Sequence, residues 1–187
     1  TGAPAVFDTA LGWRFPNAKM ATLFPLEQMG ETAENIVDEF KISRADQDAF
    51  ALRSHKLAVE NRNAFKREIV AVEVASKKGP PTIVDVDEGP RDDTSLEALA
   101  KLKAAFRANG SVTAGNSSGL NDGASALVVT SRAFAKAHGI AVRATIRAVG
   151  AAGVNPRTMG IGPVPATKKA LARAGLTLAD IDVIELN

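Results

Sequence analysis

Cysteine and tyrosine are both absent from the 187 residues of the chain. Without cysteine, the sequence can form neither a disulfide framework nor a thiolate metal site. Aromatic residues make up only 5% of the chain, so we expect a core built from Ala, Val, Leu and Ile. Charge of one sign is not in excess either, because 23 basic and 21 acidic residues leave a net charge of +2. A charge this small gives no argument for binding nucleic acid or an anionic membrane.

Long apolar runs are missing too, and no stretch approaches the ~20 residues that a membrane-spanning helix needs. No basic segment followed by an apolar one marks a signal peptide at the start. The chain opens on Thr1 rather than Met, so we expect its natural start to lie elsewhere. These negatives fit a cytoplasmic location. The 45% apolar and 24% charged residues that remain are ordinary for a soluble globular protein.

The first part of the chain is predicted to be mainly helical, with one small hairpin. Ser43 and Ser95 are each placed to cap a following helix, and alternating apolar residues joined by a Gly-Pro turn indicate two strands. Trp13, Phe15 and Phe24 lie in an irregular leading segment and are expected to be buried. The predicted elements are helices over 31–40, 44–65 and 95–106, and strands over 69–75 and 83–87.

After Asn109-Gly110 the pattern of residue types changes, and the second part of the chain is predicted to alternate strands with helices. Ser131 is placed to cap a short helix that Gly139 ends, and Gly175 suits the position after a later helix. A mixture of strands and helices of this kind predicts an α/β fold. The predicted elements are strands over 124–130, 142–149 and 181–186, and helices over 132–138 and 165–174.

The least generic stretch is the loop over 115–123, which is rich in Gly, Ser and Asn. It can be a flexible connection before a strand, or a ligand-facing loop of backbone N–H groups and hydroxyls. The residues themselves leave both interpretations open. The loop lacks the Gly-Lys-Ser/Thr ending of a phosphate-binding P-loop, so a protein that hydrolyses nucleotides is disfavoured.

Five segments occur in an order that resembles the thiolase family, and together they cover nearly the whole chain. Gly12-Trp13-Arg14-Phe15-Pro16-Asn17 is further similar to the thiolases of aromatic-acid breakdown that cleave 3-oxoadipyl-CoA. The five segments are Met29–Asn35 (MGETAEN), Ser43–Asp48 (SRADQD), Thr113–Ala124 (TAGNSSGLNDGA), Met159–Pro165 (MGIGPVP) and Ile184–Asn187 (IELN).

The resemblance implies a thiolase-fold fragment, α/β in class, from a dimeric or tetrameric enzyme. Residues 1–109 would be the loop domain, 110–140 the end of the N-terminal domain, and 141–187 the start of the C-terminal domain. Thiolases join or cleave 3-oxoacyl-CoA by Claisen chemistry at a thiolate, with acyl-CoA and CoA as substrates and without a further cofactor or metal. The family's nucleophilic cysteine precedes the matched region, and its second cysteine and histidine follow Asn187. The chain alone is therefore expected to be inactive.

The resemblance also assigns residues to the reaction. Asn187 matches the asparagine that holds an oxyanion-binding water, and its alternative role is to cap a strand end. Ser118 matches the contact to the pantetheine arm of CoA. The residues that match the apolar wall around that arm are Phe106, Ala114 and Leu120.

Further positions match the two ends of the substrate. Arg91 matches a basic residue near the nucleotide of CoA, where a guanidinium suits phosphate and adenine; the alternative is a loop arginine paired with Asp92 or Asp93. Met29 and Met159 match positions that line the acyl pocket, although Met also fills irregular gaps in a core.

One other interpretation is a non-catalytic, thiolase-like module that binds CoA or lipid. The cysteines and histidine of the full-length sequence would separate it from an enzyme. Gln28 stands where many acetoacetyl-CoA thiolases carry a histidine, which favours a different acyl group. His55 and His138 are expected to be solvated surface residues and to take no part in the chemistry.

Overall fold

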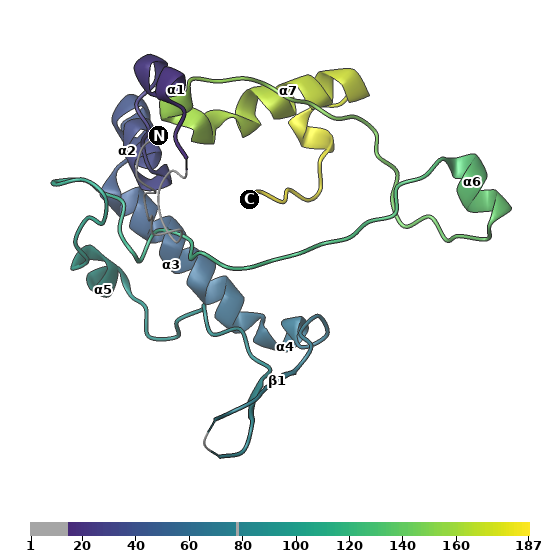
Figure 1. Ribbon diagram of the computed structural model, residues 1–187, viewed down its shortest axis with the longest axis horizontal. Helices are drawn as coiled ribbons and strands as arrows, with labels where there is room; N and C mark the ends of the chain where they lie inside the picture. The colour runs from purple at the N-terminus through teal and green to yellow at the C-terminus, as the bar shows by residue number, and fades with distance from the viewer. Residues whose placement is uncertain (1–14, 78) are drawn as a thin grey trace, which may run out of the picture. The chain divides into compact units, whose positions relative to one another are not determined.

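The computed structural model describes residues 15–77 and 79–187 (Figure 1). These residues divide into two compact units. The helical unit comprises Gln28–Leu120, and the second unit comprises residues 15–27 together with Asn121–Asn187. Trp13, predicted to be buried, lies outside the described residues. None of the described helices is both long enough and apolar enough to span a bilayer.

The helical unit begins with helices whose ends follow local signals. The Ser43 hydroxyl accepts a hydrogen bond from the Asp46 N–H at 3.1 Å, as the capping prediction requires. The predicted helix over 44–65 is interrupted at Asn61, whose side-chain amide donates to the Leu57 carbonyl at 2.8 Å. Its helices are α2 (Met29–Phe40), α3 (Arg44–Glu60), α4 (Arg62–Phe65) and α5 (Leu96–Ala100).

The helix predicted over 95–106 is shorter than expected. Ser95 caps it, but α5 ends at Ala100. The reason is tertiary: the N–H of Ala105 donates to the carbonyl of Val112 at 2.9 Å, and Ala104 pairs with Thr113 in an antiparallel bridge. The chain after α5 therefore folds back on itself instead of continuing as a helix.

The predicted hairpin is confirmed as β1 (Val72–Val74) paired antiparallel with β2 (Thr82–Val84). Val72 lies opposite Val84 in the register. The alternation of apolar and polar residues in the first strand predicts that one of its faces is buried, and this is wrong, because all residues of both strands are exposed. A lone two-stranded ribbon offers no second layer to cover either face, and Figure 1 shows this hairpin extending beyond α4, away from the other helices of its unit.

The second unit contains helices but no strand among its described residues. The strands predicted over 124–130, 142–149 and 181–186 are therefore wrong for this chain. A strand needs a neighbour that takes up its backbone N–H and C=O groups, and Val128, at 86% exposed, has no covering layer either. The elements of the unit are α1 (Ala18–Leu23), α6 (Arg132–Ala137), η1 (Pro156–Ile161), α7 (Pro163–Ala174) and η2 (Leu178–Asp180).

Local signals again explain the helix ends of the second unit. Gly139 and Gly175 follow α6 and α7 with φ of 64° and 69°, the left-handed conformation that glycine adopts without strain. Thr177 and Asp180 form a reciprocal capping box, and the hydrogen bond from the Thr177 N–H lowers the pKa of Asp180. The expected burial of aromatic residues here is wrong, because Phe15 is 89% exposed and Phe24 is 40% exposed.

Candidate functional site

The interior of the helical unit is unusually polar. Its buried residues include Thr32, Glu34, Asp48 and Thr113, against the apolar Leu99 and Val112. Buried polar groups are stable only when they are hydrogen-bonded. The partners of the two buried carboxylates lie mainly in the segment that leads into the Gly/Ser/Asn-rich loop. Polar bonds therefore attach that loop to α2 and α3.

Glu34 of α2 is the first of these attachments. Its carboxylate is 2% exposed and accepts the backbone N–H groups of Ser111 and Val112, each at 2.8 Å. The Ser111 hydroxyl adds a third bond at 3.2 Å. A side chain at Gly110 would overlap the same carboxylate, so the backbone reaches it only because this residue is glycine.

Asp48 of α3 is the second attachment. It is 4% exposed and accepts from Nε of Arg44 at 2.8 Å and from the Asn116 amide at 3.1 Å. Arg44 also donates to the carbonyl of Leu99 at 2.6 Å, at the C-terminal end of α5. This group of side chains therefore joins α3 to both α5 and the loop.

Asn116 closes the loop entrance into a turn. Its side-chain oxygen Oδ1 accepts a hydrogen bond from the Thr113 N–H at 2.7 Å. Its side-chain nitrogen Nδ2 donates to the Ser111 backbone carbonyl at 3.0 Å and also to the Asp48 carboxylate. Thr113 is fully buried. A Cβ added at Gly115 would lie only 2.5 Å from side-chain atoms of Leu99 and Leu102, so the backbone approaches the end of α5 closely there.

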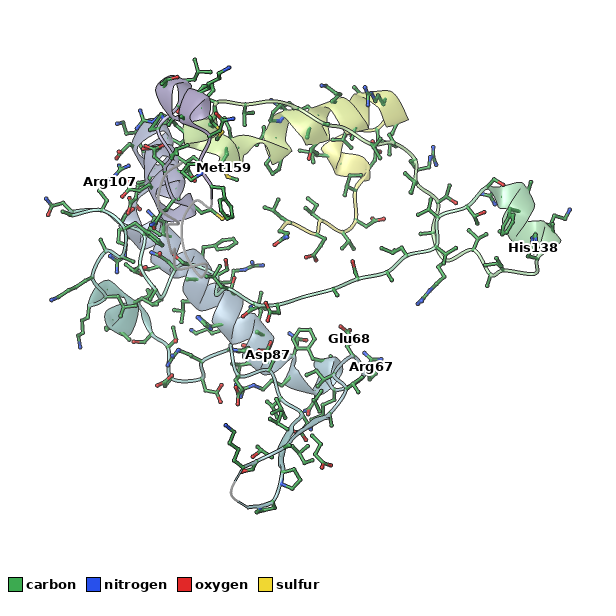
Figure 2. The ribbon with its side chains drawn as sticks, in the orientation of Figure 1. Arg67, Glu68, Asp87, Arg107, His138 and Met159 are labelled. Atoms are coloured by element: carbon green, nitrogen blue, oxygen red, sulfur yellow. The ribbon has the colours of Figure 1, made fainter. Side chains whose placement is uncertain are left out.

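Arg107, labelled in Figure 2, holds the fold-back after α5 against α2. It donates to Glu31 at 2.8 Å, to Asn35 at 2.8 Å and to Asp38 at 2.8 Å. The hydrogen bond to Glu31 is the main reason why the pKa of the Arg107 guanidinium is raised. The neighbouring Phe106 ring packs against Gly30.

The structure places most of the predicted CoA-contacting residues on or beside this attached segment. Phe106 is 41% exposed beside the start of α2, where Met29, at 74% exposed, begins the helix. Ala114 and Ser118 are exposed, and Leu120 is 80% exposed. These side chains are thus free to meet a ligand, while Val112 and Thr113, which precede Ala114, are buried.

Arg91 lies apart from that segment, after the hairpin. Its backbone N–H donates to Nδ1 of His55 at 3.2 Å, so His55 of α3 is half-buried and holds this loop rather than being a purely solvated residue. The described structure contains no ion pair between Arg91 and Asp92 or Asp93. Asp92 instead pairs with Arg62 at 2.6 Å, and their hydrogen bond raises the pKa of Arg62.

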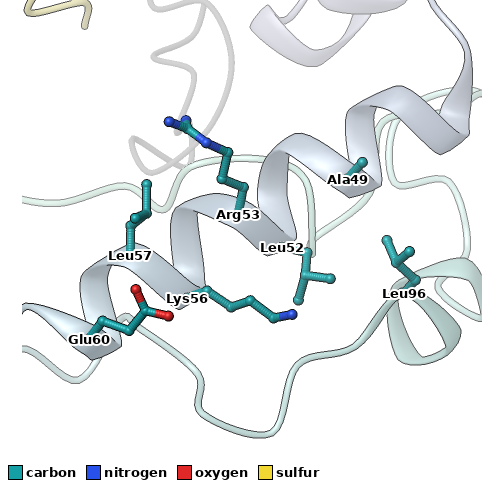
Figure 3. A pocket seen from close by; sticks show the side chains of 7 residues that line it. All are labelled: Ala49, Leu52, Arg53, Lys56, Leu57, Glu60 and Leu96. Carbon is teal, nitrogen blue, oxygen red and sulfur yellow. The ribbon is translucent and has the colours of Figure 1, made fainter.

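A shallow groove of about 330 Å³ runs between α3 and α5 (Figure 3). Lys56 and Glu60 line both this groove and a smaller hollow next to Arg91. The groove combines apolar and charged side chains on one side of α3. Its lining residues are Ala49, Leu52, Arg53, Lys56, Leu57, Glu60 and Leu96.

In the second unit, Met159 (labelled in Figure 2) is 46% exposed on η1, and Asn187 is an exposed residue at the end of the chain. η1 is attached through Arg157, which donates to the Glu27 carboxylate from Nε at 3.2 Å and from Nη2 at 3.0 Å. His138, also labelled in Figure 2, is exposed and stacks on Phe134 with ring centroids 4.0 Å apart. Met159 thus follows, two residues along η1, the arginine of a bidentate ion pair.

The side chains that attach the loop and the fold-back after α5 to α2 and α3 are not evident from the sequence alone. The signal was nonetheless in the motifs, because the attaching residues lie inside three of the segments that carry the resemblance. The order of residues does not show which distant groups the charged and amide side chains of these segments bind. The anchors in those segments are Glu31, Glu34, Asn35, Arg44, Gln47, Asp48 and Asn116.

Comparison with known protein families gives two matches, which adjoin along the chain. Residues 12–133 match the family described as "Thiolase, N-terminal domain", and residues 140–187 match "Thiolase, C-terminal domain". The chain therefore belongs to the thiolase family.

Among curated proteins of the family, the chain is similar to thiolases named for 3-oxoadipyl-CoA or beta-ketoadipyl-CoA. Over 184 residues the chain is 53% identical to the 3-oxoadipyl-CoA/3-oxo-5,6-dehydrosuberyl-CoA thiolase of Escherichia coli (strain K12), covering 97% of this chain and 46% of that protein. It is also 53% identical over 182 residues to a beta-ketoadipyl-CoA thiolase of Pseudomonas knackmussii, covering 96% of this chain and 45% of that one. The chain thus spans about half the length of the curated relatives it matches.

A solved structure gives the same result for the fold. The crystal structure of the Bacillus anthracis acetyl-CoA acetyltransferase superimposes with a TM-score of 0.78 at 39% identity. The superimposed region covers 96% of this chain and 48% of the Bacillus anthracis chain. The α/β thiolase-fold class predicted from the sequence is thereby confirmed, whereas the domain boundaries at 109 and 140 stay a prediction.

Proposed function

We propose that the full-length protein is an acyl-CoA acyltransferase that cleaves or forms 3-oxoadipyl-CoA by thiol-dependent Claisen chemistry. The observation that carries the substrate is the 53% identity, over 97% of this chain, to a 3-oxoadipyl-CoA thiolase. The GWRFPN motif also favours this acyl group, and Gln28 favours an acyl group other than acetoacetyl. In keeping with the resemblance, the enzyme would be a cytoplasmic homodimer or homotetramer that uses CoA as its second substrate.

This chain would supply binding and oxyanion stabilisation rather than the nucleophile. Ser118 offers one donor and two acceptors to the amide-bearing arm of CoA, with Phe106, Ala114 and Leu120 as its apolar wall. Arg91 would meet the nucleotide, and Asn187 would hold the water that donates to the thioester oxygen.

Assaying the full-length protein and the 187-residue chain side by side tests the proposal. With CoA present, the full-length protein is expected to cleave 3-oxoadipyl-CoA with a higher kcat/KM than acetoacetyl-CoA. The chain alone is expected to show no cleavage above a blank, because it has no cysteine to form a covalent acyl-enzyme. Cleavage by the chain alone, a preference for acetoacetyl-CoA, or CoA binding by a full-length protein that does not turn over would each contradict the proposal.

Arg91→Ala in the full-length protein is expected to raise the KM for CoA with little change in kcat, which is the mark of lost uniform binding. Arg91 is exposed and its contact would be screened by solvent and salt. The expected loss is about 1–2 kcal/mol, roughly five- to thirtyfold in KM.

Steady-state kinetics at varied CoA concentration measure this effect. Arg67→Ala is the matched control, since Arg67 is another exposed arginine of the helical unit and takes no part in the proposed site (Figure 2). An unchanged KM in Arg91→Ala would remove this residue from the CoA site.

A further inference from the structure

Hydrogen bonding along the predicted CoA-contacting loop stops two residues before Ser118. Asn116 has three side-chain hydrogen bonds and one from its backbone N–H to the Thr113 carbonyl. From Ser117 to Leu120, the described structure has no hydrogen bond from backbone or side chain. Asn116 is therefore the last fixed point before the side chain that would meet pantetheine.

The fixed point depends on a buried charge from another element. Asp48 reaches Asn116 across 68 positions of sequence, and it is nearly inaccessible to solvent. Arg44 balances this carboxylate on its other oxygen, so the bond to Asn116 does not leave an unpaired buried charge. α3 thus determines where the loop leaves the body of the helical unit.

The loop entrance is held separately on its other side. Glu34 binds the backbone of Ser111 and Val112, and Gln47 donates to the Ser111 hydroxyl at 2.9 Å. Those contacts fix the start of the turn whether or not Asn116 is held. Breaking the bond between Asp48 and Asn116 would leave Asn116 held only by bonds within the turn, to Ser111 and Thr113, so the part that carries Ser118 would lose its attachment to α3.

We infer that Asp48 and Asn116 form a positioning pair that sets the geometry of the Ser118 loop for the pantetheine arm of CoA. The inference rests on the proposed function. Neither residue needs to touch CoA: a small displacement of the loop misplaces the contact, and the loss is one of substrate binding.

Charge exchange in the full-length protein tests the pair. Asn116→Asp places two carboxylates together and is expected to raise the KM for CoA about ten- to thirtyfold, with kcat changed by less than about twofold. In the double variant Asp48→Asn/Asn116→Asp, the new amide can accept from Arg44 and donate to the new carboxylate. The KM is therefore expected to recover by at least about threefold relative to Asn116→Asp. Asn63→Asp, the same change at an exposed residue of α4, is the control and should leave the KM unchanged.

The outcomes separate the inference from the proposed function. If the unmodified protein turns over 3-oxoadipyl-CoA but Asn116→Asp leaves the KM unchanged, the pair does not position the loop. If KM, kcat and the thermal midpoint all deteriorate in Asn116→Asp and the double variant recovers none of them, the pair is merely structural and the inference fails. If the unmodified protein lacks CoA-dependent turnover, the proposed function fails first.

A second single variant keeps the test decisive should Asn116→Asp not fold. Asp48→Asn preserves the size of the side chain and one acceptor oxygen, and it is expected to raise the KM for CoA about three- to tenfold. An unchanged KM in that variant would overturn the inference.

Discussion

Asn187→Ala in the full-length protein is expected to lower kcat about a hundredfold while raising the KM for CoA by much less. By resemblance, Asn187 holds a water that donates to the thioester oxygen. That bond tightens as negative charge develops on the oxygen, so its loss is felt in the transition state more than in the bound substrate.

Steady-state kinetics over both substrates separate the two parameters. The comparison with Arg91→Ala is informative, because that change is expected to act on KM and this one on kcat. Asn63→Ala, at an exposed position of α4, provides the control for loss of an amide side chain. If Asn187→Ala kept the kcat of the unmodified protein, Asn187 would have no role in oxyanion stabilisation.

Glu34→Ala is expected to lower the free energy of unfolding by about 3 kcal/mol, since it leaves one buried and one part-buried backbone N–H group without an acceptor. Those groups belong to Ser111 and Val112, and each lies 2.8 Å from the Glu34 carboxylate. The Ser111 hydroxyl, which donates to the same carboxylate at 3.2 Å, would lose its acceptor as well.

Urea unfolding of the full-length protein, monitored by circular dichroism, measures this loss. Glu34→Gln keeps the shape and one acceptor oxygen, so it should cost only about 1 kcal/mol. Glu39→Ala, at an exposed position of the same helix, should be close to neutral. Equal stability of Glu34→Ala and Glu39→Ala would show that the buried carboxylate does not hold the loop.

Polar contacts, rather than apolar packing, hold the loop entrance of the helical unit. A core of aliphatic residues was expected from the composition, but the loop entrance is held by carboxylates, an amide and a guanidinium. Hydrogen bonds constrain direction as well as distance, whereas apolar packing is non-directional. An arrangement of this kind suits a segment whose exposed residues must face a ligand in one orientation.

The sequence by itself determined the features that arise within a few residues. Ser43, Ser95 and Ser131 cap their helices through bonds to the third residue along the chain. Gly175 ends α7, and the Gly-Pro turn joins the two strands of a hairpin. The family, and with it the thiolase fold, was also readable, because it depends on residue identities in order and not on packing.

Only the tertiary structure decided what depends on distant partners. α5 ends at Ala100 because the following chain pairs with Val112 and Thr113, which no local pattern encodes. The apolar run over 124–130 and the alternating stretch over 142–149 have the patterns of strands, but a strand forms only where another strand accepts its hydrogen bonds. Burial of Glu34 and Asp48 likewise follows from the residues that surround them in space, because a carboxylate can be buried only where donors converge on it.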